Sequence, residues 1–167
     1  MTDVKIIETA RLRLLPLTVD DARRIVDAAP APGDRWAEGY PGDGDVRSAR
    51  GFLNGVAERG DPGAYRPYEI RLLADGGTIG GIGFHGPPDT AGVVTVGYGL
   101  VPGARGQGYA TEALRALIAR AREAGATAVR GDADLDNVAS QRVMEAAGMA
   151  YEGEDEKVRN YRLVFAA

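Results

Sequence analysis

A short loop with two glycines is the segment of this sequence best suited to chemistry. Residues 105–110 (RGQGYA) follow a predicted strand over residues 93–101 and lead into a predicted helix over residues 108–124. The first backbone N–H groups of a helix have no partner within it, and the helix dipole places about half a positive charge there. Gly106 and Gly108 allow positive φ and a close approach of the backbone to a ligand. The loop therefore favours a pyrophosphate group.

Other phosphate-binding loops follow different patterns. No Lys comes after Gly108, so the segment does not match the Gly-x-x-x-x-Gly-Lys-Ser/Thr loop of nucleoside-triphosphate binders. It also lacks the third glycine of a dinucleotide-binding fingerprint, and it occurs late in the chain rather than in a first βαβ unit. The residue types alone leave two interpretations open: a coenzyme-binding loop, or a glycine-rich turn that binds nothing.

A resemblance to a known family favours the first interpretation. Arg105, Gly108 and Ala110 match the Gln/Arg-x-x-Gly-x-Gly/Ala signature of the GNAT superfamily of N-acyltransferases. The flanking stretches, residues 96–100 (VGYGL) and 111–114 (TEAL), are similar to the branch that includes the ribosomal-protein N-terminal acetyltransferases. The resemblance therefore extends beyond the glycines to the strand before the loop and the helix after it.

A second motif follows in the order that this branch has. Asn137 and Ser140 resemble its Asn-x-x-Ser segment, and Gly148-Met149 stands where the branch has Gly-Phe. The opening strand, the helix pair, the hairpin and the final strands also occur in the family's order. The resemblance thus spans essentially the whole chain and rests on two spaced motifs.

The resemblance implies a transferase that uses acetyl-CoA as co-substrate, in which an amine attacks the thioester directly. In this family two neighbouring strands splay apart, and the pantetheine arm pairs with the strand backbone around residues 98–101. A backbone N–H of that strand would stabilise the oxyanion of the tetrahedral intermediate. The residues that the resemblance assigns to the coenzyme are Leu100, Val101, Arg105, Gly106, Gln107, Gly108, Tyr109, Ala110, Asn137, Ser140 and Arg142.

Ser140 and Tyr98 are the candidate catalytic residues, with Ser140 placed near the thiol to protonate the departing thiolate. The acid–base residues that many relatives use are missing. The Glu before the Ile/Val-Gly-Tyr run is Thr95 here, and the Tyr four residues after the serine is Met144. Two rival functions therefore stay open: a module that binds acyl-CoA without turning it over, and a partner-binding domain that binds no coenzyme.

The acceptor is expected to be a small-molecule or peptide amine. A lysine side chain with a pKa near 10.4 loses its proton at a cost of about 4 kcal/mol at about pH 7.5. An α-amine with a pKa near 7.8 costs only about 0.4 kcal/mol. Because no carboxylate is placed by the motifs, we expect an α-amine or another amine of low pKa.

Three residues are candidates for contact with the acceptor. Trp36 and Tyr40 belong to a Gly/Pro-rich segment, and they either line the acceptor pocket or anchor the segment to the core. His85, the only histidine, is either a substitute base or an exposed side chain at a strand end. Glu69 is a further possible base, although a solvated acid on a strand face is the simpler interpretation.

The framework that positions these residues follows from the apolar periodicity. Alternation predicts strands at residues 9–17, 68–74, 78–84, 93–101 and 128–133 and two more before Phe165, and helical spacing predicts helices at 18–29, 45–59, 108–124 and 138–147. Early hairpins and later strand–helix alternation indicate an α+β fold with a mixed sheet. The resemblance specifies the GNAT fold: a mostly antiparallel sheet of about six to seven strands, splayed in the middle and flanked by about four helices.

Composition limits the other possibilities. A chain of 167 residues suits one domain, residues 1–167, and a formal net charge of −4 argues against a nucleic-acid partner. The absence of cysteine excludes disulfides and thiolate metal sites, and the acids of residues 152–156 read as a solvated turn, so no metal is expected. No apolar run has membrane-spanning length, so no membrane partner and a cytoplasmic location are expected. Dimers are common among members of this family, so the resemblance implies a monomer or homodimer.

Overall fold

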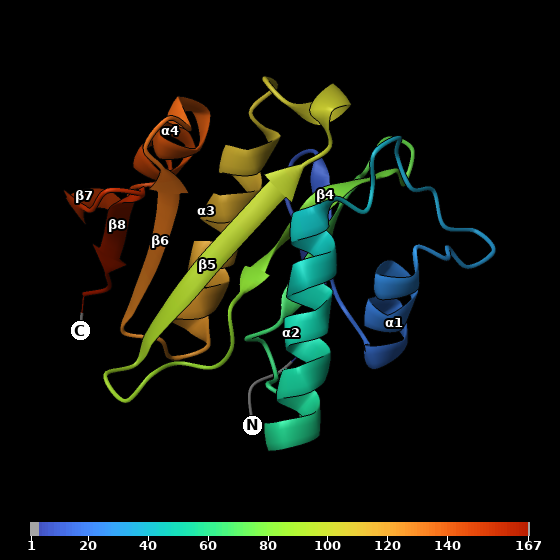
Figure 1. The fold of residues 1–167 in the computed structure, drawn as a ribbon, viewed down its shortest axis with the longest axis horizontal. Coiled ribbons are helices and arrows are strands. Elements are labelled where there is room, and N and C mark those ends of the chain that lie inside the picture. Colours follow the sequence, from blue (N-terminus) through green and yellow to red (C-terminus); the bar gives the residue numbers. More distant parts are fainter. Residues whose placement is uncertain (1–3, 167) are drawn as a thin grey trace.

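The computed structural model describes residues 4–166. Within them, one eight-stranded sheet is flanked by four α-helices (Figure 1). The strands are β1 (Ile7–Glu8), β2 (Leu12–Pro16), β3 (Pro67–Leu72), β4 (Thr78–Phe84), β5 (Val93–Leu100), β6 (Ala128–Asp134), β7 (Ala150–Glu154) and β8 (Val158–Val164). The helices are α1 (Val19–Asp27), α2 (Asp43–Arg59), α3 (Tyr109–Glu123) and α4 (Val138–Ala146), with a 3₁₀ turn, η1 (Pro102–Ala104), after β5.

The strand order is β1-β2-β3-β4-β5-β6-β8-β7, and the one parallel pair among the described strands is β5 with β6. The predicted fold class, a mixed and mostly antiparallel sheet with four flanking helices, is confirmed. The sheet has one strand more than the upper bound of the prediction. The two-residue β1, which pairs with Arg13 and Leu14, is too short to show any alternation in the sequence.

The helices cover both faces of the sheet. In Figure 1, α2 lies in front of the sheet and α3 lies behind β5. α1 packs against α2, whereas α3 contacts β2, β4, β5 and β6 and α4 contacts β6 to β8. The face of α3 that helical spacing predicted as apolar is buried, at Ala113, Leu114, Leu117, Ile118 and Ala121. This burial fixes the start of α3, and with it the loop that precedes it.

The middle of the sheet is open. β5 and β6 pair only over Val93–Ala128, Val94–Val129 and Thr95–Arg130. Beyond these pairs β5 continues to Leu100 and β6 to Asp134, and the two strands diverge (Figure 1). The splay that the resemblance implied is therefore present, between β5 and β6.

The start of α2 differs from the prediction. The helix begins at Asp43 and has Gly42 as its N-cap, so Asp45, where the predicted helix begins, is the third residue of the helix. The Asp45 carboxylate Oδ2 accepts a hydrogen bond from the Gly42 N–H at 2.9 Å. A carboxylate at this position satisfies the N-cap amide from inside the helix, which moves the helix start towards the N-terminus.

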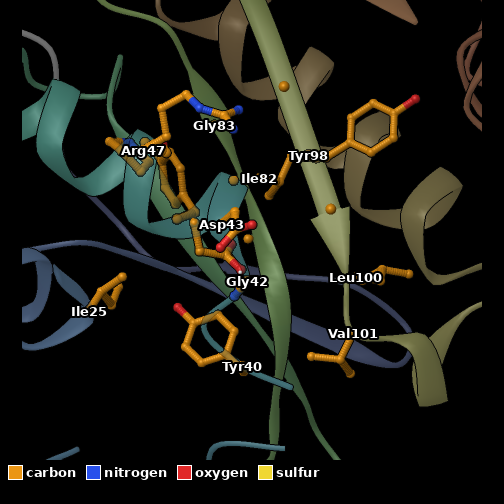
Figure 2. Close-up of a pocket in the computed structure, with 18 of the residues that line it drawn as sticks. Ile25, Tyr40, Gly42, Asp43, Arg47, Ile82, Gly83, Tyr98, Leu100 and Val101 are labelled. Carbon is orange, nitrogen blue, oxygen red and sulfur yellow. Dashed lines mark hydrogen bonds between the residues drawn. The ribbon is translucent and has the colours of Figure 1, made fainter. Parts of the chain in front are cut away.

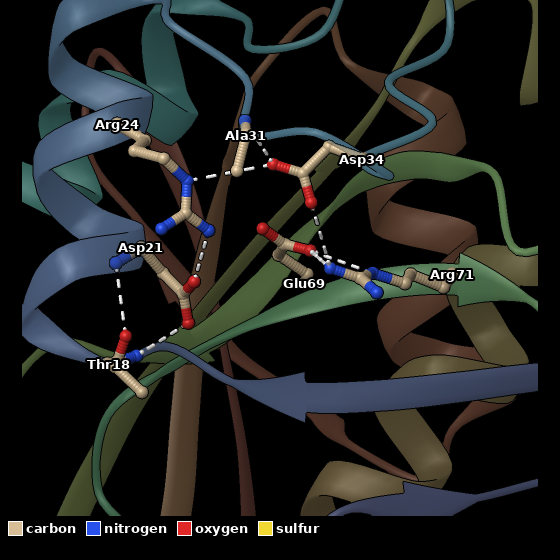
Figure 3. A network of polar contacts seen from close by, with 7 residues as sticks. All are labelled: Thr18, Asp21, Arg24, Ala31, Asp34, Glu69 and Arg71. Atoms are coloured by element: carbon tan, nitrogen blue, oxygen red, sulfur yellow. Dashed lines mark hydrogen bonds and ion pairs between the residues drawn. The ribbon is translucent and has the colours of Figure 1, made fainter.

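A polar network holds the segment between α1 and α2 against the sheet (Figure 3). Glu69 on β3 bonds Arg71 at 2.8 Å, and Arg71 lies 3.8 Å from Asp34. Asp34 lies 3.6 Å from Arg24, which in turn bonds Asp21 at 2.6 Å. The interpretation of Glu69 as a solvated acid is wrong, because its side chain is only 4% exposed. Burial raises the pKa of Glu69, and Arg71 opposes that rise.

The contact of β4 with β5 depends on a glycine, and this gives a stability prediction. A Cβ on Gly80 would lie 2.1 Å from the carbonyl oxygen of Gly99, whereas a Cβ on Gly99 would meet nothing within 4 Å. We expect Gly80→Ala to lower the free energy of unfolding by about 1–3 kcal/mol in urea denaturation. Gly99→Ala is the matched control and should change it little. Equal effects of both substitutions would contradict the close approach of the two strands.

Candidate functional site

The predicted coenzyme loop connects β5 to α3. Gly106 and Gly108 have φ of +77° and +83°, the left-handed conformation that glycine adopts without strain. Gly108 is the N-cap of α3, so the first-turn N–H groups of that helix open towards the loop. Figure 1 shows the loop at the end of the sheet where β5 and β6 diverge. A helix N-terminus and the opening between the strands therefore meet at one end of the molecule.

Arg11 from the chain just before β2 holds this loop in place. Its Nη1 donates to the Gln107 carbonyl at 2.9 Å and its Nε to Glu112 at 2.7 Å. The guanidinium also lies 4.4 Å from the centre of the Tyr109 ring. Glu112 also accepts hydrogen bonds from the side chain of Thr9 and the backbone N–H of Arg11. Burial alone would raise the pKa of Glu112, but these bonds hold it below its usual value.

The edge of β5 that faces the opening carries free backbone positions for an extended ligand. The His85 N–H donates to the Thr95 carbonyl at 2.9 Å and the Val101 N–H to the Ile79 carbonyl at 2.8 Å, so the odd-numbered residues bond β4. In an antiparallel pair these bonds alternate, so the backbone groups of Tyr98 and Leu100 point away from β4. β6 has already diverged there.

Not every backbone group at this edge is available. Arg105 folds back, and its Nε donates to the Leu100 carbonyl at 3.1 Å. Both backbone groups of Val101, a residue that the resemblance assigned to the coenzyme, are used within the protein, because its carbonyl accepts from the Ala104 N–H at 3.0 Å. The N–H groups of Tyr98 and Leu100 are thus the positions best suited to pair with a pantetheine arm.

The two candidate catalytic residues lie in contact across the opening. The hydroxyl oxygens of Tyr98 on β5 and Ser140 on α4 are 2.8 Å apart, and the Tyr98 hydroxyl also lies 3.0 Å from the Ser140 carbonyl. Burial raises the pKa of Tyr98, and the bond with Ser140 opposes the rise. Tyr98 therefore keeps its proton at neutral pH, which suits a proton donor.

The other sequence positions discussed around the opening between β5 and β6 differ in their contacts and exposure. The Asn137 side-chain oxygen caps α4 by accepting from the Ser140 N–H at 3.1 Å, so its amide nitrogen is the part that faces a ligand's acceptors. Arg142 is exposed on α4. Thr95, where relatives have a Glu, accepts from Arg130 at 3.1 Å, and Met144, where relatives have a Tyr, is 1% exposed. Neither position offers an acid or a base.

A cavity of about 410 Å³ lies between α2, β4 and β5 (Figure 2). Glycines at residues 81, 83, 97 and 99 line it along β4 and β5. Figure 2 shows Tyr40 and Arg47 on one side of β5 and the Tyr98 ring on the other. The predicted site residues that line the cavity are Tyr40, His85, Tyr98, Leu100, Val101 and Arg105.

The two aromatic residues of the early segment have different positions. Trp36 packs edge-on against Tyr40 with ring centres 5.3 Å apart, and its backbone bridges to Thr78 at the start of β4. Among the described residues, those lining the cavity include Tyr40 but not Trp36. Trp36 therefore anchors the segment to the sheet, and Tyr40, 8% exposed, both packs on it and faces the cavity. His85 is exposed at the cavity's rim.

Asp45 is a residue of this cavity that the sequence motifs did not indicate. It lines the cavity from the first turn of α2, beside Gly81 of β4. Burial raises the pKa of Asp45, and the hydrogen bond from Gly42 opposes the rise. The motifs place no carboxylate here, but the cavity contains this one. An aspartate at a helix start is ordinarily interpreted as a capping residue, so the sequence gives no signal that Asp45 also lines the cavity.

Comparisons with known proteins agree with this arrangement. Residues 11–150 match the family model described as an acetyltransferase (GNAT) domain, and the chain belongs to the GNAT acetyltransferase family. The family that the sequence motifs predicted is thus confirmed. A search of the curated proteins gives no match.

Solved structures share the fold over almost their whole length. RimJ from Mycobacterium smegmatis, in complex with a CoA disulfide, has 19% identity and a TM-score of 0.70, with 98% of this chain and 90% of that chain covered. RimL, a ribosomal L7/L12 α-N-protein acetyltransferase in complex with CoA, has 18% identity and a TM-score of 0.69, with coverages of 96% and 98%. MccE, a microcin C7 self-immunity acetyltransferase with acetyl-CoA and AMP, has 15% identity and a TM-score of 0.65, with coverages of 94% and 94%.

Two further findings concern the described residues as a set. Within residues 4–166, no helix combines the length and the apolar character needed to cross a membrane. The same residues contain no cluster of three or more His, Cys, Asp or Glu side chains that could hold a metal ion.

The contacts of Arg11 predict an effect on coenzyme binding. We expect Arg11→Gln to weaken the binding of acetyl-CoA about tenfold in isothermal titration, equal to about 1.4 kcal/mol, because the loop loses its tie to Gln107 and Glu112. Stability should change by less than about 1 kcal/mol, since the ion pair is partly exposed. The control is Arg13→Gln, which breaks an exposed pair between Arg13 on β2 and Glu8 on β1. An unchanged affinity in the Arg11 variant would show that the loop needs no such tie.

Proposed function

We propose that residues 1–167 act as one catalytic domain that transfers an acetyl group from acetyl-CoA to a primary amine. The observation that carries this proposal is the opening between β5 and β6, with the N-terminus of α3 at its mouth and the Tyr98–Ser140 pair across it. An unpaired strand edge, an anion-binding helix end and a proton donor are the three features that a pantetheine thioester requires. Membership of the GNAT acetyltransferase family supports the proposal.

In this proposal the coenzyme arm lies in the opening and pairs with the backbone of Tyr98 and Leu100. The N–H groups of residues 106–110 bind the pyrophosphate, Asn137 bonds the arm through its amide, and Arg142 reaches the nucleotide phosphates. The amine attacks the thioester carbonyl from the cavity side, and a backbone N–H of β5 stabilises the oxyanion. As the C–S bond breaks, the thiolate receives a proton from the Tyr98–Ser140 pair.

The acceptor we propose is an α-amine. Its pKa lies about 2.6 units below that of a lysine side chain, so less free energy is needed to expose the lone pair at neutral pH. The likeness to RimL, an α-N-protein acetyltransferase, supports the same class at 18% identity. A neighbouring hollow of about 670 Å³ shares Arg47, Ser48, Pro67 and His85 with the acceptor cavity. Because the hollow adjoins the cavity, a peptide acceptor has room there for the residues that follow its α-amine. The cytoplasmic location and the monomeric or homodimeric state stay predictions.

A second candidate is a module that binds acyl-CoA without transferring the acyl group. The observation that favours it is the surroundings of Thr95 and Met144, which offer no acid or base where relatives have both. Release of CoA thiol in the presence of any amine separates the enzyme from the module.

Coenzyme binding can be tested by thermal unfolding. Acetyl-CoA at about a hundredfold excess over its dissociation constant should stabilise the folded chain by about 2.7 kcal/mol. We expect Gly108→Glu to abolish this shift, because it adds a charged side chain at a φ of +83° beside the proposed pyrophosphate site.

The matched control is Gly125→Glu. Gly125 has a φ of +100° just beyond the other end of α3, and a Cβ there meets nothing within 4 Å. This variant carries similar backbone strain but should keep the acetyl-CoA shift. Loss of the shift in both variants, or no shift in the natural chain, would overturn the proposed coenzyme site.

The amine class is tested by thiol release at about pH 7 with two short peptides. One has a free α-amine and no lysine, and the other has an acetylated α-amine and one lysine. We expect the first to react at least about tenfold faster, because its amine is partly neutral at this pH. Equal rates with the two peptides would remove the preference for α-amines.

A further inference from the structure

Asp45 is a carboxylate in the acceptor cavity to which the proposed function gives no role. Its Oδ2 accepts from the Gly42 N–H at 2.9 Å. Its Oδ1 lies so close to β4 that a Cβ on Gly81 would come within 2.5 Å of it. Among residues 4–166 no donor is hydrogen-bonded to Oδ1, so this oxygen is left for a donor that enters the cavity.

The position of Asp45 relative to β5 is favourable for catalysis. The same cavity is lined by Gly99 and Leu100, whose strand edge receives the thioester in the proposed function. An amine in this cavity therefore lies between a carboxylate and the reacting carbonyl. Space for it is open above Gly99 of β5, where a Cβ would meet nothing within 4 Å.

We propose that Asp45 binds the ammonium group of the acceptor and takes the proton that the amine must lose before it attacks. This inference rests on the proposed function. In the step, an N–H bond of the ammonium breaks and an O–H bond forms on Asp45. The neutral amine then forms the C–N bond, the C–S bond breaks, and the amide nitrogen releases its second proton. One of the two protons replaces the proton that the Tyr98–Ser140 pair gives to the CoA thiolate, and the other goes to water.

The groups around Asp45 fit this role. Those that line the cavity are Asp43 and Arg47 from α2, Tyr68 and His85 from the sheet, and Tyr40 and Arg105 from the loops. Burial, followed by the charges of Glu69 and Asp45, raises the pKa of Tyr40, so this phenol stays neutral and accepts no proton. The raised pKa of Asp45 narrows its gap to the pKa of an amine, which lowers the cost of proton transfer.

The rival base in the cavity is His85. Its Nε2 would be 2.5 Å from a Cβ on Gly97, so the ring lies over β5. It is exposed to solvent, and it lines both the cavity and the adjoining hollow. Asp45 and His85 differ in burial and lie on different elements, and substituting each in turn shows which of them takes the proton.

The test is the pH dependence of kcat/KM in Asp45→Asn. The amide oxygen can still accept from the Gly42 N–H, so the start of α2 is kept. Thiol release with alanine amide, or with the fastest peptide of the screen above, is measured from about pH 6 to about pH 9. Below the pKa of the amine, kcat/KM of the natural chain should change little with pH. In the same pH range kcat/KM of the Asn variant should rise about tenfold per pH unit, because this variant accepts only the neutral amine. Above the pKa of the amine, its kcat/KM should approach that of the natural chain.

Two further variants make the result specific. Asp21→Asn is the matched control, since Asp21 is the third residue of α1 and accepts from the Thr18 N–H at 2.9 Å in the same way. It should lower stability but keep the natural pH profile. Asp45→Ser, which removes the carboxylate in a different way, should repeat the profile of Asp45→Asn and guards against a defect specific to that variant.

A loss of activity in Asp45→Asn that is the same at every pH would overturn the inference. A kcat/KM that rises steeply with pH in His85→Gln, together with one that stays flat in Asp45→Asn, would show that His85 takes the proton instead. Both outcomes differ from failure of the proposed function, in which the natural chain releases no thiol with any amine. The acetyl-CoA thermal shift of the Asp45 variants should equal that of the natural chain.

Discussion

The early end of pairing between β5 and β6 is the constraint on which the rest of the site depends. A strand edge in the middle of a sheet leaves backbone N–H and C=O groups without partners, and such groups are costly unless water or a ligand satisfies them. α4 packs at the base of the opening. A Cβ on Gly131 of β6 would lie 3.1 Å from the sulfur of Met144 and 3.4 Å from Val96, so the strand, the helix and β5 are in close contact there. Above this contact the Tyr98–Ser140 bond joins β5 to α4.

This packing gives a physical account of Met144. The side chain is 1% exposed and fills the base of the opening, so the residue at this position serves packing rather than proton transfer. Met suits an irregular gap because its side chain is unbranched and flexible. In the proposed function, proton donation comes from another group near the opening, and the only hydroxyl pair among the described residues that spans β5 and α4 is Tyr98 with Ser140.

The sequence predicted those parts of the site that depend on neighbours in the chain. The loop at residues 105–110, the buried face of α3 and the hairpins follow from local patterns, and the family resemblance indicated Tyr98 and Ser140 separately, without their contact. Arg11 could not be found in this way, because the loop carbonyl that it binds, at Gln107, is 96 residues away. Glu69 was misjudged for the same reason, since the segment that covers it becomes visible only in three dimensions.

Two carboxyl groups near the acceptor cavity have raised pKa values, and their surroundings separate their roles. Glu69 is 4% exposed, but Arg71 bonds it at 2.8 Å and the network continues to Asp34. A buried carboxylate with a cation in contact is compensated, and it holds structure together. Asp45 has one amide donor and no cation bonded to it among the described residues. A carboxylate that is desolvated by burial and left without a cation attracts a cationic ligand. In the proposed acyl transfer the protonated acceptor is that cation, which is why we assign the proposed role to the unpaired acid and not to the paired one.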